Sequence, residues 1–235
     1  MAPTTLAPPE RRPAIALPVR TAIGKKYVVA ASGIIGLGFV LGHMVGNLHA
    51  FQGPKQINSY GESLRTLGEP LLPRSLLLWI VRIVLIVAVT LHVVFTVQLA
   101  RQSRRARPVR YSHTGIVQAS YASRTMRWGG AAVFLFIVFH LMDFTWGVHP
   151  HFVRGDVYGN LVSGFRRPVV TAVYIVAMAC LSAHVYHGTW STTQTLGLNQ
   201  VRWDRAIRRV ATALAVILFV GFAAVPVGVL VHLVR

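Results

Sequence analysis

The sequence predicts an all-α integral membrane protein, a bundle of five transmembrane helices. Its composition is the first indication, because 54% of the 235 residues are hydrophobic and only 13% are charged. A soluble domain would carry about one-quarter charged residues. The second indication is that five apolar segments are each long enough to cross a hydrocarbon layer about 30 Å thick. These segments cover residues 27–48, 75–99, 126–148, 168–190 and 206–233.

The positive charge follows the pattern of membrane topology. The net charge is +18, from 24 basic and 6 acidic residues. Such a balance in a soluble protein would indicate nucleic-acid binding, but here lysine and arginine gather at the ends of the apolar segments. Sixteen of them fall on one predicted side of the membrane and seven on the other. The excess predicts a cytoplasmic N-terminus and a C-terminus outside.

The chain divides into a tail and one membrane domain. Residues 1–22 are rich in proline, alanine and arginine and lack the apolar core of a signal peptide, which predicts a disordered cytoplasmic tail. Residues 23–235 form the predicted five-helix domain. The loop at 51–74 contains Gly-Pro and Gly-Glu-Pro elements, which favour turns and a short surface helix. A single cysteine, Cys180, excludes an internal disulfide.

Each of the first four apolar segments contains an internal histidine. An ionisable residue at such a position is costly and by default marks a functional site. At about 1.5 Å of rise per residue, His43 and His140 lie roughly 25 and 20 Å from the predicted inner end. His92 lies roughly 14 Å from that end, and His184 is also close to it. The depths therefore predict an outer pair, His43 with His140, and an inner pair, His92 with His184.

Paired imidazoles at one depth suit the two axial positions of a haem iron, with the porphyrin inside the bundle. Gly36 and Gly46 fall near the helical face of His43 and predict space there for a flat group. A tetrahedral zinc site fits less well, because the pairs lie at two depths and mostly lack cysteine or carboxylate neighbours. Two alternatives stay open: a haem-free anchor with hydrogen-bonded structural histidines, and a small transporter with a histidine relay.

Three further polar residues lie close to these histidines in the sequence. His187 competes with His184 as the fourth-segment ligand, and the greater depth of His184 favours His184. Arg82 lies near the depth of the outer pair, where it could contact a haem propionate or a quinone oxygen. Asp143 could orient a ligand, accept a proton or pair with an arginine. A mutual ion pair between Arg82 and Asp143 is the alternative for both.

The histidines stand in motifs that resemble a known family. The motifs are Gly42-His43-Met44-Val45-Gly46-Asn47-Leu48, Thr90-Leu91-His92, Phe139-His140 and His184-Val-Tyr-His187-Gly188-Thr-Trp190. The chain resembles the five-helix dihaem cytochrome b anchors of succinate:quinone oxidoreductases and quinol:fumarate reductases, of the actinobacterial kind. The resemblance covers nearly the whole chain from Lys25, and the four-histidine spacing is its specific part.

The resemblance implies two haem b groups in a multi-pass protein of the cytoplasmic membrane. His43 and His140 would be the axial ligands of a distal haem, and His92 and His184 those of a proximal haem. A cytoplasmic flavoprotein subunit would carry out the succinate chemistry, so no catalytic residue is expected in this chain. An iron–sulfur subunit would dock on the inner face and exchange electrons, through the haems, with a membrane quinone, menaquinone in the family.

A quinone site is expected near the distal haem, and a site nearer the inner face, at the iron–sulfur subunit, stays open as the alternative. The candidate contacts of a quinone or a haem propionate are His49, Glu62, Arg65, Arg82, Asp143 and His187. Some relatives carry a proton-conducting carboxylate near the fourth-segment histidine. Cys180 and Ser182 stand there in this chain, so that feature of the family is not expected here. A higher-order oligomer in the lipid membrane is compatible with the resemblance, whereas a nucleic-acid partner is not expected.

Overall fold

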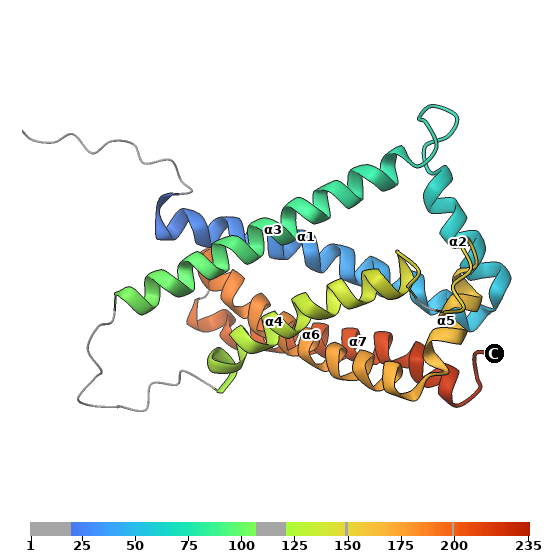
Figure 1. Ribbon diagram of the computed structural model, residues 1–235. Coiled ribbons are helices and arrows are strands. Elements are labelled where there is room, and N and C mark those ends of the chain that lie inside the picture. Colours follow the sequence, from blue (N-terminus) through green and yellow to red (C-terminus); the bar gives the residue numbers. More distant parts are fainter. Residues whose placement is uncertain (1–19, 107–120, 149, 199) are drawn as a thin grey trace, which may run out of the picture.

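A computed structural model describes residues 20–106, 121–148, 150–198 and 200–235 (Figure 1). Every regular element in these ranges is a helix, and five are long and apolar enough to cross a membrane, as the sequence predicts. Most of the predicted tail, residues 1–19, lies outside the described residues. The five long helices are α1 (Ala22–Leu48), α3 (Leu76–Arg105), α4 (Tyr121–Phe144), α6 (Pro168–Thr195) and α7 (Asp204–Leu230).

Local sequence signals account for where these helices begin. Thr21 caps α1, because its side chain accepts a hydrogen bond from the N–H of Gly24 at 2.9 Å. Pro168 occupies the first turn of α6, where its missing N–H costs nothing. The far end of α3 differs from the prediction. The helix continues six residues beyond residue 99, because the arginines and glutamine that follow the apolar stretch are good helix formers.

Two short helices lie at one end of the bundle. The helix α2 (Pro54–Thr66) confirms the surface helix expected in the 51–74 loop, whereas α5 (Val157–Phe165) has only nine residues and was not expected. Asp156 caps α5 by accepting from the N–H of Gly159 at 2.9 Å. We call this end the α2/α5 end, and the opposite end, with the short helix η3 (Val201–Trp203), the η3 end (Figure 1).

The largest hydrophobic core lies at the α2/α5 end. It joins the short helices to α6, α7 and the turn η2 (His49–Gln52) that follows α1. Burying the two short helices there ties both connecting loops to the long helices. The core residues are Ala50, Ile57, Leu161, Val162, Phe165, Tyr174, Val225, Val229 and Val234.

The helices α6 and α7 pack along a regular seam. Ala211, Leu218 and Val225 are spaced seven residues apart on α7 and are 0%, 0% and 3% exposed. A seven-residue repeat keeps small and branched side chains on one face of a helix. The helix α1 joins the same group of helices, because Gly221 of α7 leaves room for Met44. These three helices form the closely packed part of the bundle.

The helices α3 and α4 are the loosely packed part. Among the long helices, α3 packs along α1 and α4 packs along α6. Only 6% of the apolar window of each is buried within the protein. Figure 1 shows α3 and α4 lying apart, and α3 crossing α1 and separating from it toward the α2/α5 end. The bundle therefore consists of two helix pairs, α1/α3 and α4/α6, held together chiefly through α7 and the core.

Replacing Leu218 with alanine tests the seam. Leucine-to-alanine changes in cores cost about 2–5 kcal/mol. We expect the lower end, about 2 kcal/mol, because lipid is as apolar as the protein interior and only packing is lost. Thermal unfolding of the protein in detergent measures the loss. Leu135→Ala, at a residue 67% exposed on α4, is the matched control. Equal losses for both variants would contradict the seam.

Candidate functional site

The structure brings the four histidines together in the two pairs that the depths predict. The ring centroids of His43 and His140 are 5.8 Å apart, and their planes cross at 74°. Those of His92 and His184 are 6.1 Å apart, and their planes cross at 62°. Each pair joins one histidine from the α1/α3 helix pair to one from the α4/α6 helix pair. We call them the His43–His140 pair and the His92–His184 pair.

Neither histidine pair lies between helices that pack closely. His43 is on α1 and His140 is on α4. Within the described residues, the long helices that pack along α1 are α3, α6 and α7, and α4 is not among them. His92 is on α3 and His184 on α6, and α3 packs along α1 and against α2. The imidazole rings therefore meet where the helix backbones stay apart. Such an arrangement suits a group that is held between the helices.

The two pairs lie at different levels along the bundle. The backbone at Gly33 of α1 is against His92, and the backbone at Gly130 of α4 is against His184. His43 and His140 each follow the glycine of their own helix by ten residues. At 1.5 Å per residue, both helices independently give a separation of roughly 15 Å between the levels. The His43–His140 pair is the nearer one to the α2/α5 end.

The spacing of the rings within each pair fits one metal ion between two imidazoles. A ligating imidazole nitrogen lies about 2 Å from a transition-metal ion, so two rings on opposite sides of one ion place their centroids roughly 6 Å apart. Both pairs have this spacing. Within the described residues, no group of three or more metal-binding side chains forms. Each pair thus offers two protein donors, which suits haem iron and not a tetrahedral zinc ion.

The side chain of His92 is held from behind by α1. Its Nδ1 lies 3.2 Å from the carbonyl oxygen of Val29 and 3.1 Å from Oγ of Ser32. Because the Ser32 hydroxyl also lies 2.7 Å from the Val28 carbonyl and donates to it, Ser32 has no second proton for His92. The Nδ1–H of His92 therefore donates to Val29, and the lone pair of its Nε2 is left for another partner. Ligating histidines commonly have such a partner.

His140 is held from behind by a tyrosine of α6. Its Nδ1 lies 3.1 Å from the hydroxyl of Tyr174, a buried residue in the core. Sequence analysis did not identify Tyr174. Its signal was available, because a tyrosine hydroxyl inside an apolar segment must find a polar partner. Aromatic rings also surround this pair: Phe39 stacks on His43 with a centroid distance of 5.4 Å, and Phe136 lies against His140.

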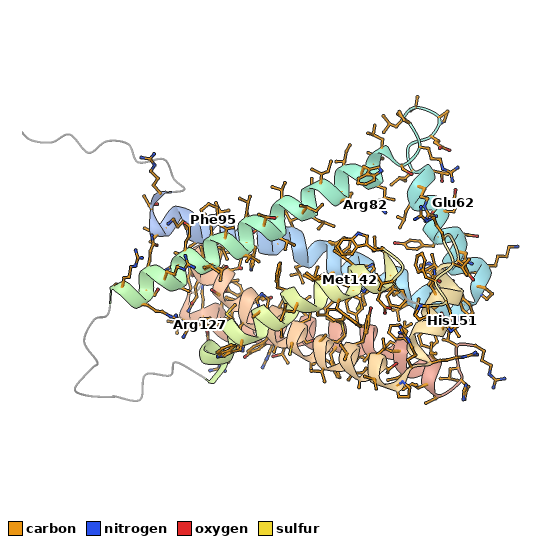
Figure 2. The ribbon with its side chains drawn as sticks, in the orientation of Figure 1. Glu62, Arg82, Phe95, Arg127, Met142 and His151 are labelled. Carbon is orange, nitrogen blue, oxygen red and sulfur yellow. The ribbon has the colours of Figure 1, made fainter. Side chains whose placement is uncertain are left out.

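Asp143 pairs with Arg167 and not with Arg82. The carboxylate of Asp143 is buried, and Oδ1 lies 3.1 Å from Nη2 of Arg167 at the start of α6. The proposed mutual ion pair of Arg82 and Asp143 is therefore wrong, whereas the pairing of Asp143 with an arginine is confirmed. The guanidinium of Arg82 lies 4.9 Å from the ring centroid of Trp79. Figure 2 shows Arg82 on α3, toward the α2/α5 end.

The structure brings His184, and not His187, to His92. His187 contacts the ring of Tyr186 and lines a groove of about 420 Å³ between α6 and α7. The Nδ1 atom of His184 is buried and has no hydrogen-bond partner in the described residues. A Cβ at Gly130 would lie 3.5 Å from Cε1 of this ring, an ordinary van der Waals contact. The backbone of α4 at Gly130 thus lies directly beside His184.

The glycines beside His43 have different roles. A Cβ at Gly36 would meet nothing within 4 Å, so the expected space exists there. A Cβ at Gly46 would lie 2.6 Å from the ring of Tyr60. The interpretation of Gly46 as space for a flat group beside His43 is therefore wrong, because α2 packs against α1 at this glycine. Sequence spacing could not reveal this contact, since Tyr60 comes from a separate short helix.

The remaining predicted contacts lie at the α2/α5 end. His49 stacks on Tyr60 with a centroid distance of 4.8 Å, and it lines a groove of about 360 Å³ beside α2. Glu62 forms ion pairs with Arg65, at 3.2 Å, and with Arg74. Figure 2 shows Glu62 on α2. The structure therefore places Glu62 and Arg65 in an ion-pair network of their own, apart from the histidine rings.

Comparison with known proteins adds no identification. No family model matches the chain, and no curated protein or solved structure is found to be similar to it. The geometry of the two histidine pairs and the sequence motifs are therefore the basis of the functional argument that follows.

Replacing Arg167 with alanine tests the buried ion pair. Removing one partner of a buried pair costs about 3–5 kcal/mol, because the other charge is left without compensation. We expect about 3 kcal/mol, since the Arg167 side chain is 39% exposed. Thermal unfolding in detergent measures the loss. Arg74→Ala breaks an exposed pair with Glu62 and should cost less than about 1 kcal/mol. A comparable small loss for Arg167→Ala would contradict the pairing.

Proposed function

We propose that this chain is the dihaem cytochrome b anchor of a succinate:quinone oxidoreductase in the cytoplasmic membrane. It passes electrons between an iron–sulfur subunit and a membrane quinone. The observation that carries the proposal is the presence of two imidazole pairs at two levels, each with ring centroids about 6 Å apart. The family resemblance of the motifs around these histidines supports the same assignment.

In this proposal, His43 and His140 hold one haem b, and His92 and His184 hold the other. When bound, each haem supplies a one-electron carrier. The protein contributes the axial nitrogens, the hydrogen bonds that hold His92 and His140, and the space left by glycines. The apolar helices α3 and α4 are little buried against the rest of the chain, so flat groups bound beside them would add to their contacts. Two carriers roughly 15 Å apart form a path along the bundle axis.

The η3 end carries exposed positive charge, on which the soluble subunits would dock in this proposal. Basic residues there are exposed on the last turns of α3 and around η3, which supports a cytoplasmic location for this end. A flavoprotein and an iron–sulfur subunit with acidic surfaces would be attracted to it. The exposed basic residues are Arg101, Arg104, Arg105, Arg202, Arg205, Arg208 and Arg209, of which Arg208 pairs with Asp204.

The quinone site belongs at the α2/α5 end in this proposal, beside the His43–His140 pair. Asp143 already binds Arg167, and Glu62 already binds two arginines. His49 lines a groove with polar walls, and Arg82 has no carboxylate partner in the described part of the chain. Arg82 is therefore the donor that best suits a quinone oxygen. The Nδ1 of His49 already donates to the carbonyl oxygens of Val45 and Gly46, so its neutral ring offers an acceptor, Nε2, at the groove. Menaquinone is the quinone that the resemblance favours.

A reduced-minus-oxidised spectrum with haem quantification tests the proposal directly. Two imidazole pairs predict about two b-type haems per chain in the purified protein. A haem-free anchor and a histidine-relay transporter both predict none. Protein free of haem, after expression with adequate haem supply, would overturn the proposal and leave those two alternatives.

Single histidine variants test the ligand assignment. We expect His43→Ala and His92→Ala each to remove a different haem, because each breaks a different pair. His184→Ala should remove the same haem as His92→Ala. The controls are His49→Ala and His187→Ala, which change histidines outside the pairs and should retain both haems. Haem content and resolved spectra of each variant give the answer. Loss of a haem in His187→Ala with none in His184→Ala would reverse the α6 assignment.

A further inference from the structure

Beyond the axial ligands, a chain of polar side chains leads from His140 toward the surface at the α2/α5 end. The Nδ1 of His140 lies 3.1 Å from the Tyr174 hydroxyl, which lies 3.5 Å from Oδ2 of Asp143. The other carboxylate oxygen of Asp143 lies 3.1 Å from Arg167. Tyr174 and Asp143 are each only 6% exposed. The described surroundings of His92 contain only neutral partners, Ser32 and a backbone carbonyl.

The chemistry of these groups gives one consistent set of hydrogen-bond directions along the chain, in which the 3.5 Å contact of Tyr174 with Asp143 is the longest. The carboxylate of Asp143, paired with a guanidinium, is ionised and can only accept. The single proton of the Tyr174 hydroxyl is therefore donated to Asp143. The same oxygen can then only accept from His140, so the imidazole must carry its proton on Nδ1. The Nε2 lone pair of His140 is the one left for a metal ion.

We infer that Asp143, acting through Tyr174, positions His140 as an Nδ1-protonated ligand and makes it a stronger donor than an unsupported imidazole. The inference rests on the proposed function and adds two positioning residues to it. Accepting the Nδ1 proton raises the basicity of a ligating histidine. A phenol that donates to a carboxylate is itself a better acceptor, because successive hydrogen bonds polarise one another. A more basic ligand favours ferric over ferrous iron.

Redox titration of the purified haem protein tests this inference with Tyr174→Phe. The variant retains the buried ring and removes only the hydroxyl. We expect the preference of one haem site for ferric over ferrous iron to fall about tenfold. That change raises its midpoint potential by about 59 mV for a one-electron couple. The haem affected should be the one that His43→Ala removes, and the potential of the other should stay unchanged. Asp143→Asn should shift the same haem in the same direction.

Tyr186→Phe is the matched control. Tyr186 lies twelve residues along the same helix, and its ring contacts His187. This variant should move neither midpoint potential. Haem content and thermal unfolding are measured for every variant, so that a packing defect is recognised by the loss of haem or by a lowered melting temperature.

The outcomes separate this inference from the proposed function. Wild-type protein without haem would overturn both. Wild-type protein with two haems, and a Tyr174→Phe variant with unchanged potentials, would overturn only the role of Asp143 and Tyr174. Equal shifts of both haems, or loss of haem together with a lowered melting temperature, would show a general structural role and would also overturn it.

Discussion

The feature on which the rest of this structure depends is the free-energy cost of placing imidazole rings in an apolar layer. A polar side chain without a partner in hydrocarbon costs several kcal/mol, so a buried histidine is favoured where its nitrogens find partners. His92 and His140 satisfy Nδ1 through partners on neighbouring helices. The ring centroids of these two histidines lie 6.1 and 5.8 Å from those of a second imidazole. In the proposed function, one metal ion would give a partner to a nitrogen of each ring in a pair.

The packing of the bundle is arranged around this requirement. The well-buried contacts are at the α2/α5 end and along the α6/α7 seam, where Leu218 is fully buried. The helices α3 and α4, which carry His92 and His140, have little buried surface of their own. Much of the stability therefore comes from the α2/α5 end and the α6/α7 seam, to which α3 contributes little. A group bound between the two helix pairs would add contacts to α3 and α4 that the chain alone does not provide.

Sequence could predict the spans and the histidine pairing, because both depend on one-dimensional quantities, apolar length and depth. It could not predict features that depend on how separate helices meet. The nine-residue α5 is too short for a periodic pattern, and burial against α2 and α6 stabilises it. Gly46 was misinterpreted because its neighbour, Tyr60, belongs to another helix. Arg167 replaced Arg82 as the partner of Asp143 for the same reason, since depth alone does not say which helices face each other.

The proposed function gains a direction from the difference between the two pairs. His92 donates to a backbone carbonyl, a neutral acceptor, whereas His140 donates to a phenol backed by an ionised carboxylate. Hydrogen bonds assisted by a charge are the stronger ones. In the proposed function, an iron held at the α2/α5 end would thus hold its electron less tightly than one held at the η3 end. Electron transfer from the α2/α5 end to the η3 end would then be the downhill step, and transfer in the opposite direction the uphill one.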